Sequence, residues 1–141
     1  MQQTKDSNTV LVSTLDSTIR LFDKGNGQLL KRYRGHANQN YRIWSCLGLG
    51  DAVIVSGSED GYLYAWDLLE GKLVEKLEAH SGKVASVVAW NSNKKEWASA
   101  GADGRYFYPD PTLTVDRLTR YRYRFYLGYE TLIRSVPIRP S

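Results

Sequence analysis

Histidine, serine and aspartate occur together twice in this chain, first as His36, Ser56 and Asp60, then as His80, Ser99 and Asp103. Such a set could supply a general base, a nucleophile and an orienting carboxylate for hydrolysis. The two histidines are 44 residues apart and the serines and aspartates keep nearly the same offset, so the set is duplicated. A duplicated polar set is typical of a repeated scaffold rather than of one active site. We therefore predict no catalytic residues and no small-molecule substrate.

Metal and cofactor chemistry find little support in the sequence. The available nitrogen and sulfur ligands are His36, His80 and Cys46, and their spacing matches no zinc-binding pattern. No phosphate-binding loop of the GxxxxGK type is present, and Gly57 and Gly61 flank a hairpin turn instead. We predict neither a metal site nor a cofactor.

The duplicated residues lie in longer repeats that must position them. VIVSGSEDGYLYAWD (53–67) returns as EWASAGADGRYFYPD (96–110), and VLVSTLDSTIRLFD (10–23) precedes both. Short apolar runs alternate with turn residues, which predicts four strands in each unit and an all-β chain. A period of 40–45 residues with Gly-His early and Trp-Asp late is typical of β-propeller blades. We predict a partial propeller of about two to two and a half four-stranded blades.

The chain divides into three predicted parts. Residues 1–9 are polar, and we expect them to be frayed or disordered. Residues 10–110 form the blades: a partial one at 10–26, a full one at 27–70 and a degenerate one at 71–110. Pro109 stands where the middle copy has Trp66, so its strand should end there or lie at an edge. Residues 111–141 form a basic, aromatic tail without further repeats.

Charge and cysteine usage narrow the function. Up to residue 110, 13 Lys and Arg balance 13 Asp and Glu, so the net charge of +4 resides in the tail. A neutral body argues against a broad nucleic-acid surface. Cys46 is the only cysteine, and no apolar run suggests a secretory signal or a membrane span, so we expect a reducing cytoplasmic or nuclear location and no membrane partner.

Two runs carry a more specific resemblance, namely 11–41 (LVSTLDSTIRLFDKGNGQLLKRYRGHANQNY) and 55–74 (VSGSEDGYLYAWDLLEGKLV). They resemble the C-terminal repeats of the kinase-organizer branch of the WD-repeat family, and the likeness extends over about Val10 to Gly104. The resemblance implies a scaffold that gathers kinases of the mitogen-activated cascade. It also implies a link to the spliceosome and pre-mRNA splicing. The expected partners are therefore proteins.

The same resemblance implies a role for the polar residues. In the family they form a hydrogen-bonded structural tetrad, which corresponds here to His36, Ser56, Asp60 and Trp66. The donors and acceptors of these side chains suit such a chain. The last copy keeps the partial tetrad His80, Ser99 and Asp103 without the tryptophan, so we expect an interrupted network there.

The tryptophans and two loops are the further candidates for contact. We interpret the tryptophans as residues that pack between blades. An exposed one would instead anchor a partner. The four are Trp44, Trp66, Trp90 and Trp97. We also expect the loops Lys24–Gly27 and Leu69–Lys72 to be displayed to partners.

The tail supports a second hypothesis. Arginines alternate with aromatic residues there, as in grooves that bind single-stranded RNA; the residues are Arg120, Tyr121, Arg122, Tyr123 and Arg124. The alternatives are therefore an RNA-processing factor that contacts RNA through the tail, or a truncated fragment without function. The oligomeric state stays open.

Overall fold

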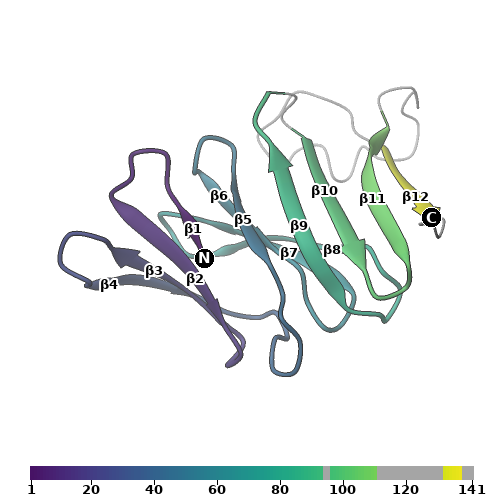
Figure 1. Cartoon of the computed structure of the whole chain (residues 1–141), viewed down its shortest axis with the longest axis horizontal. Coiled ribbons are helices and arrows are strands. Elements are labelled where there is room, and N and C mark those ends of the chain that lie inside the picture. Colours follow the sequence, from purple (N-terminus) through teal and green to yellow (C-terminus); the bar gives the residue numbers. More distant parts are fainter. Residues whose placement is uncertain (94–95, 111–131, 138–141) are drawn as a thin grey trace.

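The computed structural model describes residues 1–93, 96–110 and 132–137. Its strands form three four-stranded antiparallel sheets, in the orders β1-β2-β3-β4, β5-β6-β7-β8 and β12-β11-β10-β9. The sheets stand side by side, and the first strands β1, β5 and β9 are neighbours along one side of the array (Figure 1). This arrangement confirms the predicted all-β fold of stacked, blade-like sheets. In the described part of the chain, no helix is long and apolar enough to cross a membrane.

The twelve strands are short, as expected for turns every few residues. Their bounds are β1 Gln2–Gln3, β2 Thr9–Thr14, β3 Thr18–Asp23, β4 Leu29–Tyr33, β5 Ser45–Gly48, β6 Val53–Ser56, β7 Tyr62–Asp67, β8 Leu73–Glu78, β9 Ala85–Asn91, β10 Glu96–Gly101, β11 Arg105–Asp110 and β12 Leu132–Pro137.

The sequence repeat and the sheet are out of phase by one strand. β4 lies in the repeat that begins at residue 27, yet it pairs with β3 in the sheet of the preceding copy. β8 is likewise the outer strand of the β5–β8 sheet, although its residues open the next repeat. Each repeat therefore supplies one strand to the sheet before it and three to its own, which ties neighbouring sheets together covalently.

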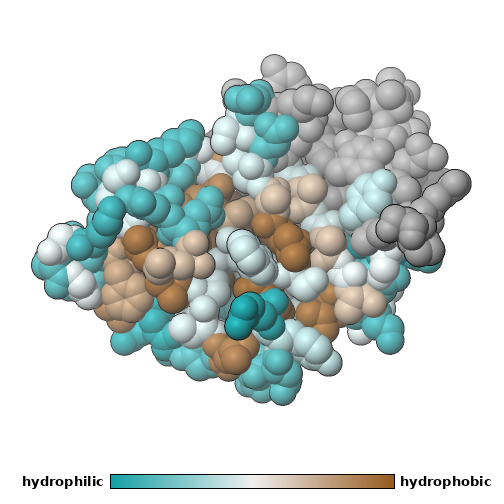
Figure 2. All heavy atoms as spheres, viewed as in Figure 1, coloured by the Kyte–Doolittle hydropathy of each residue, from teal (hydrophilic) through white to brown (hydrophobic). Residues whose placement is uncertain are grey.

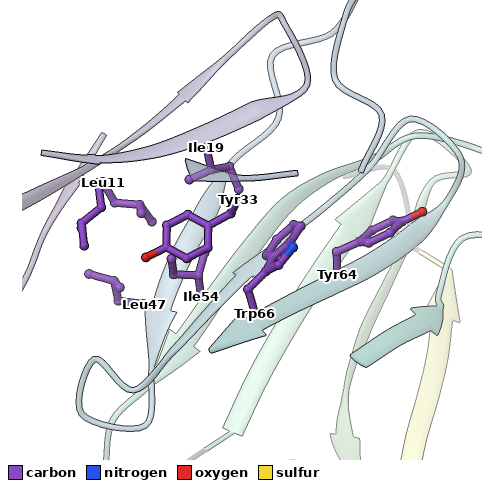
Figure 3. Packing of buried hydrophobic residues seen from close by; sticks show 8 residues of the cluster. Leu11, Ile19, Tyr33, Leu47, Ile54, Tyr64 and Trp66 are labelled. Carbon is purple, nitrogen blue, oxygen red and sulfur yellow. The ribbon is translucent and has the colours of Figure 1, made fainter. Parts of the chain in front are cut away.

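Strand alternation places apolar side chains on both faces of the middle sheet. Ile54, Tyr64 and Trp66 point to the first sheet, where they meet Leu11, Ile19, Leu21 and Tyr33 (Figure 3). Val55, Leu63 and Ala65 point the other way and pack against Ala85 and Val88 of β9. Because neighbours in a strand face opposite sides, one sheet contributes to two cores. Hydrophobic residues gather near the middle of the face seen in Figure 2, with hydrophilic residues toward its border.

The N-terminal residues differ from the expectation that 1–9 is frayed. Gln2 and Gln3 form β1, which pairs with Leu11 and Val10 of β2. The side chain of Gln2 also accepts a hydrogen bond from the N–H of Leu47 in the next sheet at 2.8 Å. The segment thus pairs with the first sheet through its backbone and with the second through the Gln2 side chain, which holds it in place although it is hydrophilic.

Pro109 stands within β11 rather than at its end. β11 pairs with β10 only at Phe107 and Tyr106, so no β10 partner needs a hydrogen bond from position 109. On the other side β12 pairs along the whole of β11, with Ile133 opposite Pro109. The prediction that the strand ends at Pro109 or lies at an edge is therefore wrong, because β11 continues to Asp110 and lies between β10 and β12. β12 completes the third sheet with residues from the predicted tail.

Candidate functional site

The repeated polar sets lie at one end of the sheets. We name it the His36 end and define it by the turns 15–17, 34–44, 57–61, 79–84 and 102–104. These turns lie toward the bottom of Figure 1. Backbone hydrogen bonds join turns of neighbouring sheets, including Ser17 N–H to Asn38 O at 3.0 Å and Ala85 N–H to Ser58 O at 2.9 Å. The His36 end is therefore a continuous surface.

In the third repeat the expected residues are joined. Nδ1 of His80 lies 3.0 Å from Oδ1 of Asp103, and its Nε2 lies 3.1 Å from Oγ of Ser99. Desolvation raises the pKa of Asp103, but hydrogen bonds from the Arg105 N–H and the imidazole of His80 together lower it below its usual value. We expected an interrupted network because the tryptophan is missing, but His80 still joins Asp103 and Ser99 through hydrogen bonds.

In the second repeat the four expected residues lie close together without forming such a chain. Both ring nitrogens of His36 are buried and have no hydrogen-bond partner among the described residues. The imidazole instead packs against the Trp66 indole in a T-shaped arrangement, with ring centres 5.3 Å apart. Nε1 of Trp66 donates to the carbonyl of Arg34 at 3.0 Å, and Oγ of Ser56 donates to that of Gly57 at 3.0 Å. Asp60 accepts from the hydroxyl of Tyr64 at 2.7 Å.

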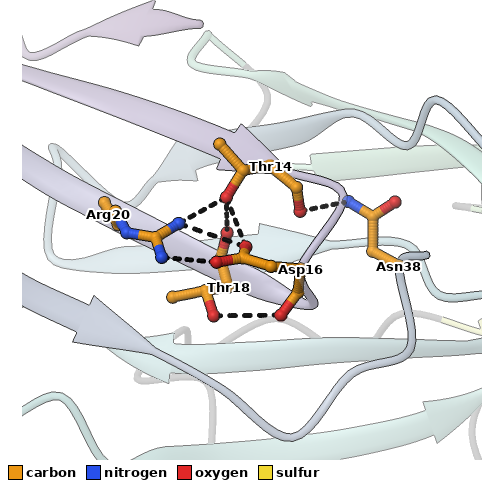
Figure 4. A network of polar contacts seen from close by, with 5 residues as sticks. All are labelled: Thr14, Asp16, Thr18, Arg20 and Asn38. Carbon is orange, nitrogen blue, oxygen red and sulfur yellow. Dashed lines mark hydrogen bonds and ion pairs between the residues drawn. The ribbon is translucent and has the colours of Figure 1, made fainter.

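The first repeat has no histidine and pairs its aspartate locally. Asp16 accepts hydrogen bonds from Thr14 and Arg20, while Asn38 of the following turn donates to the Thr14 carbonyl (Figure 4). The Arg20 guanidinium is the main cause of the lowered pKa of Asp16. The turn is thus held by a charge pair at its surface.

A small residue decides where the histidine can lie. Two positions before the aspartate, the third repeat has Gly101, and a Cβ there would lie 2.4 Å from Nδ1 of His80. The imidazole therefore fills the space of a side chain. The second repeat has Ser58 at this position, whose hydroxyl accepts from the N–H of Ala37 at 2.9 Å and donates to the Ala37 carbonyl at 3.4 Å. Gly101 thus leaves room for His80 to reach Asp103. In the second repeat the side chain of Ser58 occupies the corresponding space.

A second position, four residues after the aspartate, also affects whether the aspartate is available to the histidine. Four residues after each aspartate the sequence has Arg20, Tyr64 and Phe107 in turn. Arg20 and Tyr64 each donate to the aspartate of their own turn. Phenylalanine is a residue type without a side-chain donor, so this position of the third repeat supplies no side chain that competes with His80 for Asp103.

These contacts favour a structural role for both sets. His80 is fully buried and Ser99 is 3% exposed, so the serine hydroxyl is closed to a substrate. Cys46 is also buried, and burial raises the pKa of its thiol to about 12. No group of three or more His, Cys, Asp or Glu that could hold a metal occurs in the part of the chain that the structure describes.

The unpartnered histidine should make stability depend on pH. Burial lowers the pKa of His36, and the negative charges of Asp60 and Asp16 only partly oppose this. In the unfolded chain the pKa is near 6.5, so below that pH the unfolded state binds the proton first. The free energy of unfolding should therefore fall as pH drops below about 6.5, by up to about 1.4 kcal/mol per pH unit.

Urea denaturation of the wild type and of His36→Phe between neutral and mildly acidic pH tests this. Phenylalanine keeps an aromatic ring against Trp66 but cannot be protonated, so its pH slope should be shallower. Equal slopes for the two proteins would contradict the assignment to His36.

An exposed aromatic loop stands beside these buried groups. The carboxylate of Glu59 accepts the backbone N–H groups of Gln39, Asn40 and Tyr41 at 2.6, 2.6 and 3.1 Å. Desolvation raises the pKa of Glu59, but these hydrogen bonds outweigh it and lower the pKa to about 2. The N–H of Trp44 donates to Ser86 O at 2.9 Å, which ties the loop to the third sheet.

This loop presents two large aromatic side chains to solvent. Tyr41 is 56% exposed and Trp44 is 59% exposed. The remaining tryptophans pack: Trp66 is buried, and Trp90 and Trp97 are partly buried against the core between the second and third sheets. Sequence alone did not separate Trp44 from the others, because the residue that anchors its loop, Glu59, is distant in the chain.

The predicted loops Lys24–Gly27 and Leu69–Lys72 lie at the opposite end, which we name the Gly25 end and define by the turns 4–8, 24–28, 49–52 and 68–72. Leu69 is 81% exposed there. The predicted RNA-contacting residues 120–124 lie outside the described residues.

Three four-stranded antiparallel sheets with adjoining first strands are the blades of a partial β-propeller. Residues 27–67 and 71–106 match the family model described as WD domain, G-beta repeat, and together they make up more than half of the chain. The chain therefore belongs to the WD-repeat family, as its sequence resemblance predicted.

Relatives share these repeats over part of their length. The chain is 49% identical to human WD repeat domain-containing protein 83 over 83 residues, which are 59% of this chain and 26% of that protein. The Dictyostelium discoideum homolog of the same protein is 38% identical over 100 residues, or 71% of this chain and 30% of its own. A WD repeat-containing protein 26 homolog of Arabidopsis thaliana is 39% identical over 102 residues, or 70% and 17%. The chain spans less than a third of each of these relatives.

Proposed function

We propose that this chain is a non-catalytic scaffold that binds proteins through its His36 end. The observation that carries the proposal is the pair of exposed aromatic residues, Tyr41 and Trp44, on a loop fixed by hydrogen bonds. Tyrosine and tryptophan supply much of the binding energy at protein interfaces. A loop that is already ordered loses little conformational entropy on binding.

Family membership supports this class of function, since WD-repeat proteins generally act as non-catalytic scaffolds. The kinase-cascade and spliceosome partners implied by the resemblance are part of the proposal, as is a cytoplasmic or nuclear location. The buried serines and histidines support the non-catalytic role, because their hydroxyl and imidazole groups have no access to a substrate.

A pull-down with the full chain from cell extract tests the proposal. The double variant Tyr41→Ala and Trp44→Ala should lose most of the captured proteins, at least about fivefold, because interface aromatics dominate binding. Its stability should stay close to that of the wild type, because both side chains are exposed.

Leu69→Ala provides the comparison at the opposite end of the sheets. If it alone reduces capture, contact through the predicted Leu69–Lys72 loop is supported and the His36 end is not. If the wild type captures no protein above a bead control, the scaffold role itself is contradicted.

A further inference from the structure

The acidic and basic side chains in the turns of the His36 end differ in how many partners they have within the chain. Their acidic residues are Asp16, Glu59, Asp60 and Asp103. Each accepts hydrogen bonds from within the chain: Asp16 from Arg20, Glu59 from three backbone N–H groups, Asp60 from Tyr64, and Asp103 from His80. Lys76 adds a positive charge 3.5 Å from Asp60. The carboxylates of this surface are therefore already satisfied.

The basic residues of the same turns have no such partners within the described part of the chain. Arg34, Arg42 and Lys83 are all exposed. Among the described residues, none of their side chains has a hydrogen bond or an ion pair. The adjoining strand ends add one exposed cation, Arg105, and one exposed anion, Glu78, whose charges offset each other. Hydrogen bonds do not cancel the charge of the carboxylates, so with Arg20 and Lys76 included the surface has five basic residues against four acidic ones, and its positive excess is small.

Two of the free cations, Arg42 and Lys83, belong to the exposed aromatic loop and to the turn beside it. Arg42 lies between Tyr41 and Trp44 in the chain, and Lys83 belongs to the turn that leads into β9. Trp44 is bonded to β9 through Ser86, so the indole and the Lys83 turn flank the boundary between the second and third sheets.

We propose that the His36 end binds an acidic polypeptide segment that carries apolar side chains. The inference rests on the scaffold function and names the chemical class of the partner. The aromatic side chains of Tyr41 and Trp44 would contact the partner's apolar residues, while Arg34, Arg42 and Lys83 would attract its carboxylates. Complementary charge at the border of an interface chiefly provides specificity and a fast encounter.

Single-stranded nucleic acid also pairs with aromatic and basic residues. The surface fits it less well, because its three free cations lie in only two turns, 34–44 and 79–84, and share the surface with four carboxylates. The residues up to 110 are also neutral overall, with 13 positive and 13 negative side chains. We therefore assign the surface to a polypeptide and test nucleic acid beside it.

Fluorescence anisotropy with the full chain tests the proposal. The probe is a short labelled peptide of alternating glutamate and leucine residues, and its counterpart has glutamine in place of glutamate. The acidic peptide should bind at least about tenfold more tightly than the glutamine peptide, and its affinity should fall with added salt. Trp44→Ala and the triple variant Arg34→Glu, Arg42→Glu and Lys83→Glu should each weaken binding at least about tenfold.

The matched control reverses three exposed lysines at the Gly25 end, Lys5→Glu, Lys24→Glu and Lys72→Glu, and should bind like the wild type. The proposal is overturned by absence of peptide binding, by equal binding of the glutamine peptide, or by equal losses in the two triple variants. Tighter binding of labelled oligouridylate would assign the surface to nucleic acid. If extract proteins are still captured by the His36-end triple variant, the scaffold function stands and only the acidic partner is excluded.

Discussion

Replacing Trp66 with alanine is expected to lower the free energy of unfolding by about 3–5 kcal/mol, the usual cost of removing a large buried aromatic side chain. Trp66 is 1% exposed and lies in the core between the first two sheets (Figure 3). Its ring stacks on Tyr64 with centres 5.9 Å apart and an angle of 17°. Its N–H donates to Arg34 O at 3.0 Å. The substitution therefore leaves a cavity and removes the hydrogen bond to the Arg34 carbonyl.

Urea denaturation followed by circular dichroism measures this change. Trp66→Phe is the informative comparison, because the first repeat already has Phe22 at the corresponding position. It keeps an aromatic ring but lacks the N–H, so it should be less destabilising than alanine. Trp44→Ala is the surface control and should change stability by less than about 0.5 kcal/mol. A comparably small effect of Trp66→Ala would contradict the packing of the two sheets.

Gly57→Ala is expected to destabilise the protein by about 3 kcal/mol or more, at the upper end of what overpacking costs. A Cβ on Gly57 would lie 1.9 Å from the carbonyl oxygen of Ala85 and 2.8 Å from its carbonyl carbon. These are backbone atoms of β9, so no flexible side chain can move aside. Relief would require the second and third sheets to separate at the His36 end.

Gly82→Ala is the matched control. Gly82 has a φ of +70° with nothing within 4 Å of an added Cβ, so alanine there meets backbone strain but no clash. Its expected cost is about 1–2 kcal/mol. Thermal and urea denaturation of both variants separate the two effects. A smaller loss for Gly57→Ala than for Gly82→Ala would show that the two sheets are not in this close contact.

Several features of the fold were predictable because their causes are local. Apolar residues such as Ile54 and Val55 alternate between two faces, and turns follow at Asp60-Gly61, where Gly61 has a φ of +84°. Short-range signals of this kind, repeated with a period of about 44 residues, were enough to predict the strands and the blades. The packing of Trp66 was predicted together with that of the other tryptophans, from the tendency of large aromatic side chains to fill the space between blades.

The sequence by itself determined the repeated strands, their turns and the family of this chain, because those depend on neighbouring residues. Tertiary structure alone decided how the polar sets are connected and which aromatic residues face solvent. The second and third repeats have His, Ser and Asp at nearly the same spacing, yet only His80 reaches its aspartate. The space beside Gly101 and the competing donors around Asp60 exist only once the strands have packed, since both depend on which side chains share one small volume.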